Sequence, residues 1–216
     1  MAGIYATSNV CRASQRQDGG PQPSSSLTSK RRPHSLAGSP PPATSISDAA
    51  FFEQPTAASS TGGLVGRHAG DGVVAFFLAE VAGSESAAAR NCIAAARALR
   101  GALSDVATRS DLEPGDVVLR FGLHWGSKVY VGQITTSGRT EVNALGDEVN
   151  ETARIEACAT GGRTLASKDL LERLEPDHAA ELALNPDRIT YTALGDLDTA
   201  TEKARRDAPA IAVCDV

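Results

Sequence analysis

The chain is organised by the stretch Gly146-Asp147-Glu148-Val149-Asn150-Glu151-Thr152-Ala153-Arg154-Ile155-Glu156. Its first two residues follow the apolar pair Ala144-Leu145, which predicts a strand that ends in a tight turn. Asp147 is well placed to cap the N-terminus of a helix. We expect that helix to run from about residue 148 to residue 160. It should stop at Gly161-Gly162, because glycine tolerates the left-handed conformation of a helix C-terminus.

Asn150 and Arg154 lie four residues apart in this expected helix, so they project from one face, one turn from each other. An arginine offers forked donors and an asparagine offers an oriented amide, and neither group needs to titrate. The pair is therefore a candidate grip for a polyphosphate. The alternative is a solvated helix face that happens to carry one Asn and one Arg. Glu148 and Glu151 are expected to be solvent-facing carboxylates suited to the first turn of the helix, and not metal ligands.

Composition narrows the function classes. The 216 residues carry a net charge of −5, which gives no indication of nucleic acid or an anionic membrane surface as a partner. The longest apolar run, residues 73–79, is too short to span a bilayer, and residues 1–20 lack the apolar core of a signal peptide. The four cysteines are scattered without a CxxC pair, which favours free thiols in a reducing cytoplasm.

The chain divides near residue 60. Residues 1–60 are rich in Ser, Pro, Gln, Gly and Ala, show no sustained helical or strand period, and are expected to be a low-complexity, disordered tail. Residues 61–216 have the texture of a folded domain. A hairpin is expected at residues 63–77 around a Gly-Asp-Gly turn, and a long alanine-rich helix at residues 84–106.

Shorter elements follow the long helix. We expect strands at residues 117–124, 129–133, 141–145, 163–166, 189–194 and 210–214, a polar loop at 135–140 and a helix at 167–174. Strands that alternate with helices, combined with antiparallel hairpins, predict an α+β domain with helices packed on one sheet. His68, His124 and Trp125 are expected to be packing or turn residues.

Four short blocks occur in order along this domain: Arg67-His68-Ala69-Gly70-Asp71-Gly72, Phe121-Gly122-Leu123-His124-Trp125-Gly126, Val131-Gly132-Gln133-Ile134 and Leu145-Gly146-Asp147-Glu148-Val149-Asn150-Glu151-Thr152-Ala153-Arg154. In this order and spacing they resemble the motifs of class III nucleotidyl cyclase catalytic domains, the family of adenylate and guanylate cyclases. The wider stretch is similar to actinobacterial members. The resemblance implies a ferredoxin-like, palm-type fold with an antiparallel-rich sheet covered by helices.

The resemblance also implies a mechanism. Cyclases of this family work as dimers, with active sites in the groove between two catalytic domains. Two Asp residues of one protomer hold two divalent ions, Mg²⁺ or Mn²⁺, which lower the pKa of the ribose 3′-OH and stabilise the leaving pyrophosphate. By position, Asp71 matches the second metal carboxylate. Asn150 would orient the ribose and Arg154 would stabilise charge on the α-phosphate, both from the opposite protomer.

The resemblance also implies a role in substrate binding for three further residues. Arg67 falls at the base-contacting Lys position, and Asn143 falls at the second purine-selecting position. Lys203 corresponds to a phosphate-binding Lys near the C-terminus, with Arg205 and Arg206 as competing candidates. The base stays open, although family frequency favours ATP over GTP.

The chain departs from the family pattern at its N-terminus. The first metal Asp normally precedes the Gly-Asp-Gly turn by some forty to fifty residues, but residues 19–47 contain no Asp or Glu. We therefore expect the first core strand to be missing and the fold to be N-terminally truncated. A frameshift or a misassigned start would produce such a segment; a real tail on a degenerate cyclase is the alternative.

Two functions remain open at this point. The first is a nucleotidyl cyclase that converts ATP, or less favourably GTP, to the 3′,5′-cyclic nucleotide and pyrophosphate. The second is a catalytically impaired pseudo-cyclase that acts as a dimerising regulatory subunit, or a nonfunctional fragment. For the active cyclase and for the regulatory subunit, we expect a homodimer or a heterodimer with another cyclase domain. In a heterodimer, a partner with an intact metal site could use Asn150 and Arg154 of this chain.

Overall fold

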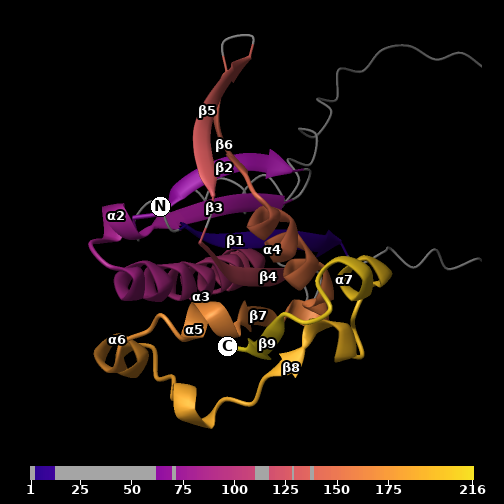
Figure 1. Cartoon of the computed structure of the whole chain (residues 1–216). Coiled ribbons are helices and arrows are strands. Elements are labelled where there is room, and N and C mark those ends of the chain that lie inside the picture. Colours follow the sequence, from indigo (N-terminus) through magenta and orange to yellow (C-terminus); the bar gives the residue numbers. More distant parts are fainter. Residues whose placement is uncertain (1–2, 13–61, 70–71, 110–116, 128, 137–138) are drawn as a thin grey trace, which may run out of the picture.

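A computed structural model describes residues 3–12, 62–69, 72–109, 117–127, 129–136 and 139–216 (Figure 1). Its main feature is a seven-stranded sheet with the strand order β2-β3-β1-β4-β7-β9-β8. The strands are β1 Gly3–Arg12, β2 Leu64–Ala69, β3 Gly72–Leu78, β4 Val117–Gly126, β7 Thr164–Ser167, β8 Thr192–Ala193 and β9 Ala212–Asp215. Strands β4 and β7 pair in parallel, whereas the other neighbours pair antiparallel. The predicted α+β class is confirmed.

A two-stranded arm stands apart from the main sheet. It consists of β5, Tyr130–Thr136, paired antiparallel with β6, Arg139–Leu145. Figure 1 shows this hairpin extending away from the body of the molecule. The loop expected at residues 135–140 is shorter than predicted, because cross-strand pairing continues to Thr136 and Arg139.

Strand β1 corrects the expectation of a missing central strand. Gly3–Arg12 pairs antiparallel with β3 on one side and with β4 on the other, so the N-terminal segment fills the middle of the sheet. The prediction of a disordered tail is therefore wrong for these ten residues. Residues 13–61 lie outside the described residues. The strand contains no Asp or Glu, so it does not supply the first metal-binding carboxylate of the family pattern.

Six helices connect the strands of the described chain. They are α2 Ala79–Ala82, α3 Glu85–Arg109, α4 Asp147–Cys158, α5 Lys168–Leu171, α6 Pro176–Glu181 and α7 Glu202–Asp207, with 3-10 turns at Thr160–Gly162, Pro186–Arg188 and Leu194–Asp196. The long alanine-rich helix is confirmed as α3. Helices α6 and α7 were not predicted, because six-residue helices show too few turns for a periodic pattern.

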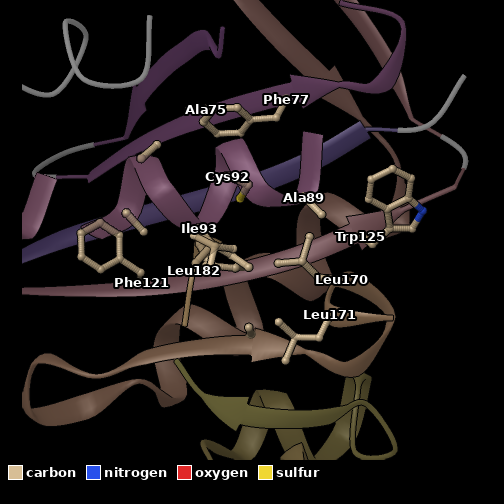
Figure 2. Packing of buried hydrophobic residues seen from close by; sticks show 14 of the residues in the cluster. Ala75, Phe77, Ala89, Cys92, Ile93, Phe121, Trp125, Leu170, Leu171 and Leu182 are labelled. Carbon is tan, nitrogen blue, oxygen red and sulfur yellow. The ribbon is translucent and has the colours of Figure 1, made fainter. Parts of the chain in front are cut away.

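Side chains alternate along β4 and divide the core between the two faces of the sheet. Phe121, Leu123 and Trp125 belong to the cluster that packs against α3 (Figure 2). Figure 2 shows Cys92 and Ile93 of α3 among these strand residues. Each fully buried large side chain stabilises the fold by roughly 1.5–3 kcal/mol, so this cluster holds α3 firmly to the sheet.

A second cluster holds α4 and α7. Its members are buried apolar residues from both helices, the adjoining strands and the turns between them: Ile155, Cys158, Ala159, Leu165, Leu194, Ala204, Ala208 and Val213. The contacts across the helix pair involve small alanines, so α4 and α7 can approach closely. This cluster fixes α7 relative to the helix that carries the candidate site.

The ends of α4 partly match the prediction. Gly146, and not Asp147, is the N-cap residue, and no side chain caps this end of the helix. Asp147 is instead the first residue of the helix, where a carboxylate interacts favourably with the positive end of the helix dipole. The helix ends two residues earlier than predicted, at Cys158 with Ala159 as its C-cap residue, and Gly161 and Gly162 adopt left-handed φ angles of 68° and 80° in the 3-10 turn that follows.

Candidate functional site

Helix α4 lies directly on β4. Arg120, Gly122 and His124 alternate with the apolar residues of this strand and therefore share the face opposite to α3. Gly122 allows the close approach, because a Cβ at this position would lie 2.5 Å from the backbone nitrogen of Glu156 and 2.7 Å from the carbonyl oxygen of Thr152. The glycine in this motif is thus explained by helix-to-strand packing.

One ion pair and one histidine–carboxylate hydrogen bond flank Gly122 and fix α4 further. The Arg120 Nε lies 2.6 Å from Oε1 of Glu156, whose side chain is only 7% exposed. The His124 Nε2 lies 3.0 Å from Oε2 of Glu151. Both carboxylates come from α4 and both partners come from β4. Position and rotation of α4 are therefore set by polar contacts as well as by packing.

The environment of His124 favours the neutral imidazole. Burial lowers its pKa below the usual range, and the carboxylates of Glu151, Asp169 and Glu148 oppose this effect only in part. A carboxylate accepts hydrogen bonds, so Nε2 carries the proton and donates to Glu151. Within the described chain, Nδ1 has no hydrogen-bond partner. His124 is a packing residue as expected, whereas the view of Glu151 as simply solvent-facing is wrong.

Asn150 and Arg154 take the outer side of α4. Asn150 is exposed, and the Arg154 side chain is 24% exposed. The Arg154 Nε lies 3.1 Å from Oδ2 of Asp207, the last residue of α7. The predicted pair therefore shares one helix at the expected spacing, and its arginine is held by a carboxylate from a second helix.

Asn143 lies on β6, three residues before the N-cap of α4. It is half-buried, and its Oδ1 accepts a hydrogen bond of 3.0 Å from the backbone N–H of Ala144. The amide nitrogen of this side chain takes no part in that hydrogen bond. Strand β6 contacts β2, the strand that carries Arg67, so the two positions assigned to the base belong to neighbouring strands.

Arg67 lies within an irregularity of the β2–β3 pairing. Val65 pairs with Ala75 and His68 pairs with Val73, so two residues of β2 oppose one residue of β3. Such a bulge commonly redirects a side chain at the edge of a sheet. Only the backbone of Arg67 is described, and Asp71 lies outside the described residues, in the turn between β2 and β3.

Lys203 is exposed on α7, one turn before Asp207. The competing residues are engaged elsewhere: Arg205 donates from Nε to the carbonyl oxygen of Gly195 at 3.2 Å, and Arg206 forms a forked contact with Asp207. Of the three basic residues of α7, Lys203 is therefore the one that is exposed and makes no hydrogen bond or ion pair within the described part of the chain.

Sequence reasoning missed Glu151 and Asp207 as partners of the site. The sequence predicts an ordinary first-turn carboxylate at Glu151, because nothing in its position three residues before Arg154 indicates a partner on β4. Asp207 has a detectable signal, because an acidic residue at a helix C-terminus opposes the helix dipole. Its two arginine partners supply the compensation.

The described residues contain no group of three or more His, Cys, Asp or Glu side chains that could hold a metal ion. No described helix is both long and apolar enough to cross a membrane. Neither the protein-family models nor the curated proteins include a match to this chain.

Solved structures do match it. The adenylyl cyclase CyaB from P. aeruginosa is 17% identical with a TM-score of 0.63, and the match covers 100% of this chain and 93% of that one. The guanylyl cyclase Cya2 is 20% identical with a TM-score of 0.66, covering 100% and 91%. The guanylate cyclase domain of RhGC from Catenaria anguillulae, solved with GTP, is 13% identical with a TM-score of 0.54, covering 100% and 96%.

These similarities define the class of fold. The chain has the fold of the adenylyl and guanylyl cyclase catalytic domains, as the sequence motifs predicted.

Proposed function

We propose that this chain is a nucleotidyl cyclase domain that converts ATP, or less favourably GTP, to the 3′,5′-cyclic nucleotide and pyrophosphate. One observation carries the proposal. In a cyclase fold, α4 presents Asn150 and Arg154 four residues apart on its outer side, while its inner side is fixed to β4 at Gly122, by one ion pair and by one histidine–carboxylate hydrogen bond. A rigid platform of this kind suits groups that must be positioned before reaction.

Each residue has a proposed task. Asn150 orients the ribose through its amide, and Arg154 stabilises the negative charge that develops on the α-phosphate during attack by the 3′-OH. Lys203 neutralises the terminal phosphates from α7. Arg67 and Asn143 contact the base. The free amide nitrogen of Asn143 would donate to a ring acceptor, because its oxygen already bonds the backbone of Ala144.

The positions matched to the family's motifs supply one of the two metal-binding carboxylates. Mg²⁺ or Mn²⁺ commonly binds through one or two carboxylates together with substrate phosphates, and Asp71 is the carboxylate that would hold it. When bound, the ion would acidify the ribose 3′-OH and neutralise phosphate charge. Strand β1, which occupies the middle of the sheet, offers no second carboxylate.

Dimerisation is part of the proposal, because Asn150 and Arg154 would act on a nucleotide held by the partner's metal site. Tyr130 and Leu145 support it. They are directly opposite in the β5–β6 arm, and they are 79% and 68% exposed. Leu145 also lies just before α4, so an apolar surface at the base of the arm adjoins the candidate site. Burial of both side chains against a second domain would remove them from water.

A dimerising subunit with impaired catalysis is the second candidate, and the absence of a carboxylate from β1 favours it. In a mixed dimer, an intact cyclase would provide the complete metal site and this chain would provide Asn150 and Arg154. Activity would then appear only after mixing.

Cyclic nucleotide formation by the purified chain separates these functions. The assay uses ATP and GTP in parallel, each with Mn²⁺ and with Mg²⁺. Asn150→Ala tests the site, and Asn185→Ala is the matched control on an exposed asparagine outside the candidate site. We expect product that Asn150→Ala abolishes and Asn185→Ala leaves unchanged. No product with either nucleotide would contradict self-sufficient catalysis, and the mixing experiment would then test the subunit role.

A further inference from the structure

We propose that Asp207 is a positioning residue that holds the Arg154 guanidinium in the orientation needed to receive a phosphate. This inference deepens the proposed function and rests on it, since it concerns the residue assigned to the α-phosphate. Nothing in the cyclase motifs of the sequence singles out Asp207. Its role follows from its contacts and from its place at the end of α7.

The contacts form a three-residue network. The Arg154 Nε lies 3.1 Å from Asp207 Oδ2. On the same carboxylate, Arg206 places Nε 2.7 Å from Oδ1 and Nη2 3.2 Å from Oδ2. Arg206 therefore holds the carboxylate in a forked contact, and the carboxylate in turn holds Arg154.

This contact determines which part of Arg154 remains for a ligand. A guanidinium is planar, with its donors in a fixed fork. Because Asp207 takes the Nε–H, the terminal amines Nη1 and Nη2 form the edge that can meet two oxygens of one phosphate. The carboxylate thus turns a flexible side chain into a prearranged bidentate donor, which lowers the entropy cost of gripping the phosphate.

The helices around the network are fixed by packing. Ile155 and Ala159 of the α4 region share a buried cluster with Ala204 and Ala208 of the α7 region. A carboxylate at the end of α7 consequently stays at one distance from α4. Asp207 also remains ionised over the working range, because hydrogen bonds from Arg206 and Arg154 lower its pKa to about 2.

A purely structural contact between two helices is the competing explanation, and the experiment separates the two. The variants are Asp207→Asn, Asp207→Glu, Arg154→Ala and the double variant Asp207→Asn/Arg154→Ala. Asp187→Asn is the matched control on an exposed aspartate of another segment. Measurements are kcat and KM for cyclic nucleotide formation, the thermal midpoint, and the solvent exchange rate of the Arg154 Nε–H proton in ¹⁵N NMR spectra.

We expect Asp207→Asn to lower kcat by about tenfold, as is typical for residues that orient a functional group, with KM changed less than about twofold. Asp207→Glu should recover part of the loss. In the Arg154→Ala background, Asp207→Asn should have no further effect, because a residue that acts through Arg154 is non-additive with it. The Arg154 Nε–H proton should exchange with solvent faster in Asp207→Asn, and its exchange rate should be unchanged in Asp187→Asn.

Two results would overturn the inference. One is a loss of kcat that persists in full in the Arg154→Ala background. The other is an Arg154 Nε–H exchange rate that Asp207→Asn does not alter. Failure of the proposed function looks different: the unaltered chain would form no product that depends on Asn150, while the exchange measurement would still decide whether Asp207 holds Arg154.

Discussion

Gly122 of β4 lies against the backbone of Glu156 of α4 so closely that a Cβ on the glycine would lie 2.5 Å from the Glu156 nitrogen. The obstacle is main chain and not a flexible side chain. Helix α4 can adopt its position over the sheet only because this residue has no side chain. The placement of Asn150 and Arg154 on the outer side of α4 depends on that contact.

We predict that Gly122→Ala destabilises the fold and displaces α4. Overpacking of a close contact typically costs about 1–3 kcal/mol, and the backbone on both sides leaves little room to relax here. The free energy of unfolding from urea titration measures the change. Gly132→Ala is the matched control, because a Cβ on this exposed strand glycine would meet no atom within 4 Å. An equal loss in both variants would contradict the packing argument.

The ion pair between Arg120 and the buried Glu156 should contribute more to stability than an exposed ion pair does. Glu156→Gln keeps the size of the side chain but leaves the guanidinium of Arg120, itself 24% exposed, without its charged partner. We expect a loss of about 1–3 kcal/mol in the free energy of unfolding. Glu172→Gln breaks the exposed pair with Lys168 and should change stability by less than about 0.5 kcal/mol. Similar losses would show that burial of Glu156 does not matter.

The low pKa of His124 predicts a pH dependence of stability. The ordinary histidine pKa is about 6.5, and burial lowers it in the folded state. Below a pH of about 6.5 the unfolded chain therefore binds a proton that the folded chain resists. The free energy of unfolding consequently decreases as the pH is lowered. His124→Gln can still donate to Glu151 but cannot titrate, so its stability should fall less steeply between about pH 7 and pH 5. Parallel curves for both proteins, measured by urea titration at each pH, would exclude this origin.

The apolar pair at the base of the arm predicts the oligomeric state. Leu145→Ser and Tyr130→Ser each remove exposed apolar surface that the proposed dimer would bury. We expect each to raise the dimer dissociation constant by about tenfold or more, as measured by analytical ultracentrifugation. Val81→Ser on α2 is the control, since Val81 is 60% exposed on a different element. A dimer that only Val81→Ser weakens would place the interface elsewhere.

The sequence was sufficient for those parts of the fold that local chemistry determines. The alanine-rich pattern predicted α3, and the Gly161-Gly162 pair placed the end of α4 within two residues of Cys158, where the helix stops. The spacing of Asn150 and Arg154 predicted their common helix. The class of fold came from the order of four motifs, and solved cyclase structures confirm it.

Long-range pairing could not be predicted in the same way. Strand β1 mixes apolar and polar residues without a strict alternation, and its place in the sheet depends on β3 and β4, which lie far along the chain. The contacts of Arg154 with Asp207 and of His124 with Glu151 join elements 53 and 27 residues apart. No periodic pattern contains such information, because it arises only when the elements pack.

The central position of β1 has a consequence for synthesis of the protein. A ribosome completes β1 first, but β4, its longest partner, ends at Gly126, which is 114 residues beyond Arg12. At translation rates of about 5–20 residues per second, β1 waits on the order of ten seconds for that partner. During this interval the backbone donors and acceptors of β1 that face β4 are open to nascent chains on neighbouring ribosomes, so the rate of elongation bears directly on the yield of correctly assembled sheet.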